Sequence, residues 1–170
     1  MILFAGMDAM SKTLIQTLPL TGILWVRYGF YATFGLMLVI KFSGMRGFRS
    51  KVLLLQCGRG FAMLADIALF VLSFRFMQLA EAHSIAAIAP LMVTALAVPI
   101  LGERVGRRRW LAVIVGFIGV LIILRPGSEV FRAVAILPLL ATASFSLYLV
   151  LTRIVARHDG LGTSFFYPGL

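Results

Sequence analysis

The sequence predicts an all-α integral membrane protein, a multi-pass helical bundle, because of its composition and its six long apolar runs. Its 170 residues are 61% hydrophobic and 13% charged, whereas a soluble domain is about 45–50% apolar and about 25% charged. A soluble chain of this length could not bury so much apolar surface in one core. Each run approaches the roughly 20 residues that a helix needs to cross a bilayer. We therefore expect lipid to surround the helices.

Polar residues, glycines and prolines end each run and set the expected helix boundaries. The expected spans are residues 1–18, 23–40, 52–76, 82–101, 110–126 and 131–154, with a seventh helix from about 165. The first run closes at Pro19 and Gly22, and the sixth has no charged residue from Ala133 to Thr152. Pro90 lies inside the fourth run, where it removes one backbone hydrogen bond and is expected to kink the helix.

Small residues recur at helix-packing spacing on two runs. They are Ala112, Gly116 and Gly119 on the fifth run, and Gly58, Ala62 and Ala65 on the third. This spacing lets helix backbones approach each other closely in lipid. We expect these two faces to pack against neighbouring helices.

The distribution of Lys and Arg predicts the orientation of the chain, because cytoplasmic loops of membrane proteins are enriched in both. Ten of the sixteen fall in the connections after the second, fourth and sixth runs, and three fall in the opposite connections. This bias places the N-terminus in the cytoplasm, in a protein of the cytoplasmic (inner) membrane. Nucleic acid is not an expected partner, because the basic residues form short tracts between apolar runs instead of one basic surface.

The sequence carries no recognisable catalytic or metal-binding motif. H-E-x-x-H, G-x-S-x-G and P-loop patterns are absent from it, and each of these patterns would signal a defined chemistry. The single cysteine, Cys57, cannot form an intrachain disulfide. His83 and His158 fall on opposite sides of the predicted topology, so they cannot share a metal ion. We therefore predict a protein that is not an enzyme and needs no cofactor.

Six ionisable side chains lie within or beside the apolar runs and are the candidate substrate or ion contacts. They are Asp8, Lys12, Arg27, Arg59, Asp66 and His83. An ionisable side chain near the bilayer centre costs at least about 2.5–3.5 kcal/mol, so its presence requires a reason. Asp66 is close to the middle of its run and is the strongest candidate for a group that faces a cavity or titrates a proton.

Two of the other candidates form a possible pair. Asp8 precedes Lys12 by four residues, which is the order and spacing that favour an ion pair on a helix. The pair could stabilise the first helix alone, or it could contact a substrate or coupling ion in a cavity. Arg59, seven residues before Asp66, could snorkel to the interface or reach along the helix towards that acid.

Arg27 and His83 also have two interpretations each. Arg27 could anchor the second helix at the interface beside Trp25 and Tyr28, or it could contact a substrate. Histidine changes charge near physiological pH, so His83 could relay protons. A capping or interfacial role for His83, next to Glu81, is the favoured interpretation.

Several short motifs follow one another between Gln78 and Gly127. L-G-E-R at Leu101–Arg104 precedes a basic tract, Trp110 and G-x-x-G-V, and L-A-E-A and a mid-helix A-P-L come before it. In these motifs the segment resembles the EamA family of the drug/metabolite transporter superfamily. The opening M-D-A-M-S-K and W-V-R-Y are similar to the first two helices of the metabolite carriers in that family.

The resemblance implies ten helices, arranged as two five-helix repeats of opposite topology around a central substrate cavity. Residues 1–127 would form the first repeat, and residues 128–170 would supply the sixth helix and the start of the seventh. Asp8, Lys12, Arg59 and Asp66 would then lie on cavity-lining helices. His83 stands where the family more often has a small hydroxyl residue, so no role carries over to it.

The predicted function is secondary transport of a small organic metabolite across the cytoplasmic membrane by alternating access, coupled to an ion. The alternative is a non-transporting truncated membrane protein, or an assembly or regulatory partner of a full-length carrier. Alternating access requires two repeats that rock about a shared site. We therefore expect the chain to be a fragment of a longer carrier, completed by a missing C-terminal half or by a homo-oligomer.

Overall fold

The structure is a computed structural model that describes residues 2–42, 50, 52–102, 106–124, 133–160, 163–164 and 167. This described part is helical and contains no strand, as the sequence predicts. The helices are α1 (Ile2–Thr17), α2 (Leu20–Phe42), α3 (Leu53–Ser73), α4 (Leu79–Ala86), α5 (Ala89–Leu101), α6 (Arg107–Leu124) and α7 (Ile136–Val155), with a short 3₁₀ helix, η2 (Ala133–Ala135), before α7.

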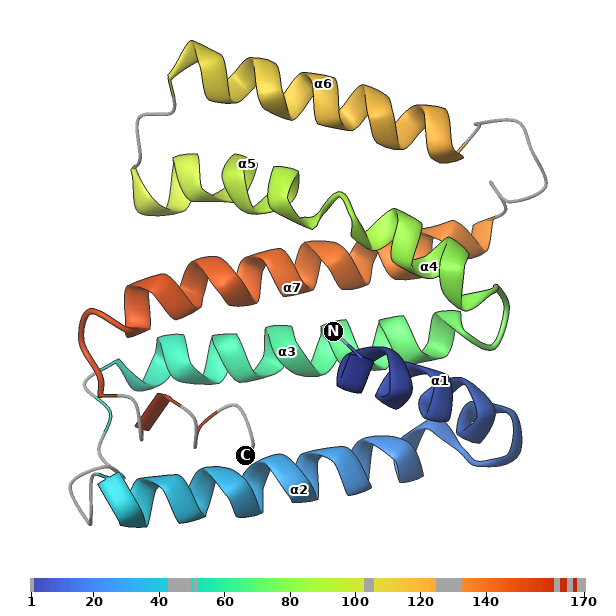
Figure 1. Ribbon diagram of the computed structural model, residues 1–170. Helices are drawn as coiled ribbons and strands as arrows, with labels where there is room; N and C mark the ends of the chain where they lie inside the picture. Colours follow the sequence, from blue (N-terminus) through green and yellow to red (C-terminus); the bar gives the residue numbers. More distant parts are fainter. Residues whose placement is uncertain are drawn as a thin grey trace.

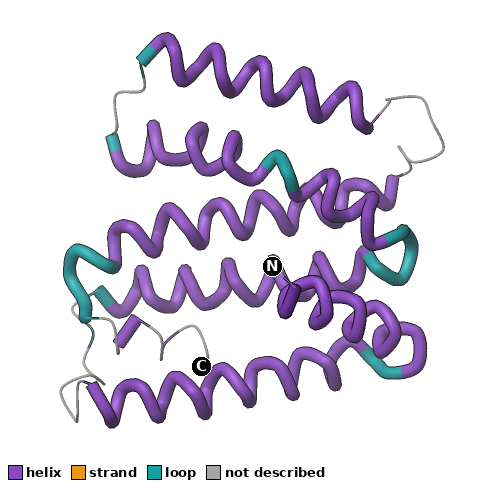
Figure 2. The backbone as a smooth tube through the Cα atoms, in the orientation of Figure 1, coloured by secondary structure: helices purple, strands orange, loops and turns teal. Residues whose placement is uncertain are grey.

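The long helices form one layer of roughly parallel rods, in the order α6, α5, α7, α3 and α2 (Figure 1). The tube in Figure 2 follows the same order, with α1 crossing in front of the layer. Among the described helices, α7 packs most extensively against α3, and it also contacts α5 and α4. The last long helix in the sequence therefore lies inside the layer, between helices that come much earlier in the chain.

Four segments of the described part are long and apolar enough to cross a membrane. They are Leu20–Lys41, Leu53–Ser73, Leu79–Leu101 and Ile136–Val155, and they correspond to the second, third, fourth and sixth expected spans. Large apolar side chains such as Trp25 and Phe61 are 80% and 73% exposed on these helices, as expected where lipid is the solvent. The first and fifth expected spans are weaker, because α1 has only 16 residues and α6 begins with three arginines.

Two expected helices at the C-terminal end of the chain lie partly outside the described residues. The sixth expected span, residues 131–154, corresponds to η2 followed by α7, and residues 131–132 lie outside the described part. Most of the seventh expected helix, from residue 165, also lies outside it, since only residue 167 is described there.

Proline breaks the fourth expected span, residues 82–101, into α4 and α5. Pro90 has no N–H to donate to the carbonyl of Ala86, and its ring crowds that carbonyl. The chain makes a tighter turn just before it, in which the N–H of Ile88 donates to the carbonyl of Ile85 at 3.1 Å. At the expected kink the helix is therefore interrupted for a short stretch between α4 and α5. The hydroxyl of Ser146 on α7 lies 3.4 Å from the Ala89 carbonyl at the start of α5.

A polar cluster fastens the start of α3 to the end of α7. The carboxylate of Asp159 accepts hydrogen bonds from the hydroxyl of Ser50 and from Nε2 of Gln56, the second at 2.9 Å. Gln56 is completely buried. The end of α2 and the end of α5 lie at this same end of the bundle (Figure 1). The helix ends that flank the connections expected to be cytoplasmic are therefore together.

The small-residue face of α6 gives the first testable prediction. A Cβ atom at Gly116 would approach Cδ2 of Leu91 on α5 to 3.0 Å, whereas one at Gly119 would meet no atom of the described structure within 4 Å. Overpacking a helix contact costs about 1–3 kcal/mol. We expect the free energy of unfolding in detergent to be lower for Gly116→Leu than for Gly119→Leu by that amount, because the change in helix propensity is common to the two substitutions. Equal effects of the two substitutions would contradict the contact.

The polar cluster around Asp159 gives the second testable prediction. Replacing Asp159 with Ala leaves the buried amide of Gln56 without its acceptor, and an unsatisfied buried donor costs about 1–3 kcal/mol. We expect Asp159→Ala to lower the midpoint of denaturant unfolding. Arg157→Ala is the matched control, because Arg157 is an exposed residue two positions away. If the two variants unfold alike, the cluster does not hold α3 and α7 together.

Candidate functional site

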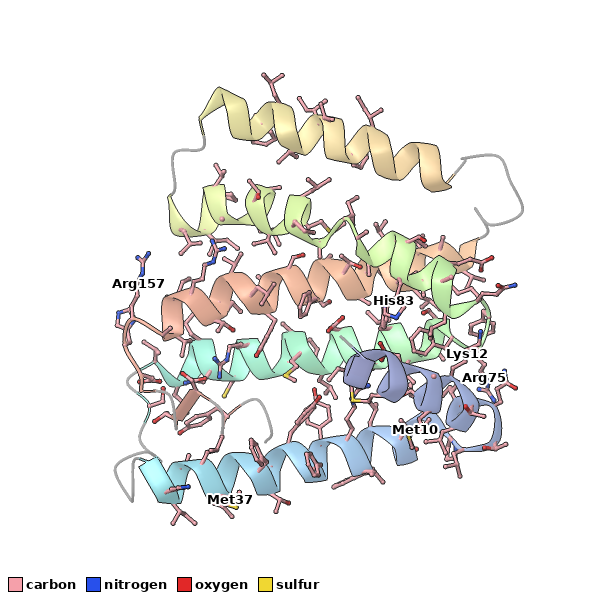
Figure 3. The ribbon with its side chains drawn as sticks, viewed as in Figure 1. Met10, Lys12, Met37, Arg75, His83 and Arg157 are labelled. Carbon is pink, nitrogen blue, oxygen red and sulfur yellow. The ribbon has the colours of Figure 1, made fainter. Side chains whose placement is uncertain are left out.

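A cavity of about 340 Å³ lies between α1, α2, α3, α7 and the junction of α4 with α5. Four of the six candidate residues line it: Asp8, Arg27, Asp66 and His83. Each comes from a different helix, so the site exists only in the folded bundle. Figure 3 shows His83 extending from α4 towards α3 and α1. The remaining wall is aromatic, aliphatic and sulfur-containing, with hydroxyl groups on Tyr31, Thr142 and Tyr148.

Asp8 pairs with His83 across the cavity, and not with Lys12. Oδ2 of Asp8 lies 3.3 Å from Nε2 of His83, which makes an ion pair when the imidazole is protonated. No ion pair joins Asp8 to Lys12, although the structure describes both residues, so the expected pair is not formed, and Lys12 does not line the cavity. Lys12 lies towards the end of the bundle where α1 and α3 terminate (Figure 3). Spacing along one helix predicts only neighbours on that helix, and here a residue of α4 reaches Asp8 instead.

His83 is built into the wall by a second contact. Its ring packs edge-on against Phe70 of α3, with the ring centroids 5.3 Å apart. The capping role favoured for His83 is not seen in the described structure, where Glu81 takes part in the cap of α4 and its carboxylate accepts a hydrogen bond from the N–H of Gln78 at 3.0 Å. His83 thus faces the cavity, while Glu81 caps α4.

Arg27 turns from α2 into the cavity. One of its guanidinium nitrogens, Nη2, lies 3.3 Å from the sulfur of Met7, and a thioether is a weak hydrogen-bond acceptor. Its Nε is buried and has no hydrogen-bond partner. The neighbouring Trp25 is on the exposed face of the helix. Arg27 therefore points away from that face, and its donors are poorly used within the protein.

Asp66 occupies the cavity wall at the middle of α3. It lies within electrostatic range of both Arg27 and Asp8. No ion pair joins Asp66 to Arg27, although the structure describes both residues. The carboxyl group of Asp66 and the guanidinium group of Arg27 therefore line the same cavity without forming an ion pair.

Arg59 lies behind the cavity wall. It is only 1% exposed, so it does not snorkel to an interface. One of its terminal nitrogens donates to the carbonyl of Ser164, and its Cζ stands 5.8 Å from the ring centroid of Tyr148. Tyr148 itself lines the cavity. Arg59 thus supports a wall residue and does not contribute its own charge to the space.

Sequence reasoning missed the contribution of α7 to this site. Thr142, Phe145 and Tyr148 lie three residues apart on α7 and supply one wall. Their only sequence signal is that helical spacing within a charge-free run, which is also typical of ordinary lipid-facing or packing residues. Two further aromatic residues, Tyr31 of α2 and Phe70 of α3, also line the cavity.

Comparison with known proteins finds transporters of small metabolites among the relatives of the chain. The S-adenosylmethionine uptake transporter of Rickettsia prowazekii (strain Madrid E) is 23% identical over 163 residues, which are 96% of this chain and 55% of that protein. The riboflavin transporter of Vibrio cholerae is 36% identical over 67 residues, 39% of this chain and 22% of that protein. A riboflavin transporter of Brucella anthropi is 27% identical over 117 residues, 69% and 41% of the two chains.

Each match covers a larger share of this chain than of the relative. The chain spans about half the length of the Rickettsia prowazekii relative. No solved structure matches the chain significantly. The relatives are named as transporters and not as enzymes, which agrees with the absence of catalytic motifs. The EamA-like transporter family matches residues 1–125, and the chain belongs to that family.

Proposed function

We propose that the chain forms part of a secondary transporter that moves a small organic metabolite across the cytoplasmic membrane by alternating access, coupled to an ion. One observation carries the proposal. Asp8, Arg27, Asp66 and His83, from four helices, meet at one cavity in a bundle of mainly apolar helices. Ionisable groups inside membrane segments usually mark substrate or ion pathways. The organisation we favour is a first repeat over residues 1–127 and the start of a second over residues 128–170.

The names of the relatives suggest what kind of solute the cavity could hold. S-adenosylmethionine and riboflavin are both small organic metabolites with a heteroaromatic ring. Four aromatic side chains line the cavity: Tyr31, Phe70, Phe145 and Tyr148. Aromatic side chains stack favourably on flat rings. These residues would hold the ring, and Asp66 is our candidate for the group that binds the coupling ion or a cationic part of the solute.

Asp66→Asn tests the proposal in proteoliposomes loaded with unlabelled solute. The probes are labelled S-adenosylmethionine and riboflavin, each followed by counterflow. The change removes the charge and keeps the shape of the side chain, so we expect the initial rate for the transported probe to fall at least about tenfold, or about 1.4 kcal/mol. Arg157→Gln, at the far end of the bundle, is the control and should keep the wild-type rate.

The outcomes separate a transporter from the alternative, a non-transporting membrane protein. A rate that Asp66→Asn leaves unchanged between about pH 5 and pH 8, the interval in which histidine titrates, would assign Asp66 a structural role. Absence of counterflow by the wild-type chain with both probes would favour a partner or remnant of a full-length carrier.

The proposed orientation, with the N-terminus in the cytoplasm, has its own test. Arg75 and Arg157 are exposed residues at opposite ends of the bundle (Figure 3). In a Cys57→Ser background, we expect a membrane-impermeant maleimide to label Arg75→Cys on intact cells and to leave Arg157→Cys unlabelled until the membrane is opened. The reverse pattern would place the N-terminus outside.

A further inference from the structure

The ion pair between Asp8 and His83 joins α1 to α4 at one side of the cavity. We propose that this pair is a pH-dependent latch, in which protonation of His83 holds α1 against α4 and closes that side, and loss of the proton releases it. The inference rests on the proposed function, because it takes the cavity to be the place that a solute must reach. It goes further, because it assigns control of access to two named side chains.

The geometry of His83 allows its charge to decide the strength of this contact. Its ring is held against α3 by Phe70 and Phe74, with centroid distances of 5.3 and 6.4 Å, while Nε2 lies 3.3 Å from Oδ2 of Asp8. A hydrogen bond between two charged groups is roughly twice as strong as one between neutral groups. A neutral imidazole therefore keeps at most a weaker bond to the carboxylate, without the attraction between opposite charges.

Few other contacts fasten α1 and α4 to each other. Among the described side chains, only Ser11 and Ile15 of α1 and Ala82 and Ile85 of α4 are buried, and α1 contacts α4 over a much shorter stretch than α3 contacts α7. The interruption before Pro90 also separates α4 from α5. Hinge motions are absorbed by a few residues at the ends of such elements, so α4 can move away from α1 without a rearrangement of α5.

His83 is the group near the latch that ordinarily changes charge close to neutral pH. The other ionisable side chains of the cavity wall are Arg27 and Tyr31 from α2, Asp66 from α3 and Tyr148 from α7. Outside the wall are Lys12 on α1, Glu81 on α4 and Arg75 just after α3. The described side chains of α6, which also packs against α4, include no ionisable group. Of these residue types, only histidine has an unperturbed transition between about pH 5 and pH 8.

A thiol at position 142 can report whether the latch is open. Thr142 of α7 lines the cavity and is 2% exposed, so a cysteine there reacts only after a reagent has entered. Thr142→Cys is made in a Cys57→Ser background, purified into lipid nanodiscs and treated with N-ethylmaleimide. Its rate is divided by the rate for Arg75→Cys, an exposed position outside the cavity, which removes the general effect of pH on thiol reactivity.

We expect this ratio of rates to rise when the pH is raised from about 5 to about 8, because His83 loses the charge that holds Asp8. The rise should be at least about twofold and at most about fivefold, or about 1 kcal/mol, which is the upper value for a partly exposed ion pair. A ratio that stays constant, or that falls, would overturn the latch.

Two variants assign the effect to the pair. His83→Gln and Asp8→Asn each remove one of the two charges and keep a polar group, so we expect both to show the high-pH ratio throughout. Lys12→Gln, one turn from Asp8 and outside the cavity, should keep the wild-type pH dependence. If His83→Gln does not fold, as judged by its elution from a sizing column, Asp8→Asn decides alone.

Another titrating group would give a different pattern. Persistence of the pH dependence in Asp8→Asn, or its loss in Asp66→Asn alone, would reject the latch. Counterflow by a wild-type chain whose ratio does not change with pH would retain the transporter and reject the latch. A pH dependence that both latch variants abolish, in a chain without counterflow, would retain the latch and reject transport by this chain.

Discussion

Charged side chains on otherwise apolar helices impose the main constraint on this fold. Each such group would be costly if it faced lipid, and each becomes tolerable where helices turn it towards a shared interior. Arg27 on α2, Asp66 on α3 and the Asp8–His83 pair between α1 and α4 all meet at one cavity. The requirement to hide these charges fixes how the helices are rotated about their axes. The outward faces are then left with side chains such as Trp25, which suit lipid.

The position of α7 follows from the same constraint. The helices of the first expected repeat cannot close the cavity by themselves, because α3 and α5 leave a gap that α7 fills. Thr142 and Tyr148 then provide the missing wall. In lipid, helices are not driven together by the hydrophobic effect, and close packing and hydrogen bonds take its place. The bonds from Ser50 and Gln56 to Asp159 supply such a fixed point where α3 begins and α7 ends.

Hydropathy along the chain was enough to predict the helical fold and most of the spans, because the bilayer dictates the length and composition of each helix. Hydropathy also identified charged residues that line the cavity, since Asp66 and Arg27 stand out against apolar neighbours. The ion-pair and contact partners of these side chains were predicted less well. The i, i+4 rule assigned Lys12 to Asp8, but the distance that decides the pairing runs between helices and depends on their rotation. Arg59 illustrates the same limit, because the groups that it contacts, the ring of Tyr148 and the carbonyl of Ser164, are far away in the sequence.

The contacts that close the cavity differ in strength between its two sides. At the end where α3 begins, Gln56 and Arg59 are 0% and 1% exposed, and opening would break their hydrogen bonds to Asp159 and Ser164, which involve charged groups and contribute about 1.5–3 kcal/mol each. At the other side of the cavity, the closing contact is the Asp8–His83 pair, whose side chains are 14% and 46% exposed. Partly exposed ion pairs contribute about 0–1 kcal/mol. Separation of α1 from α4 therefore costs less than separation of α3 from α7, and the cavity is easier to reach from the side of His83.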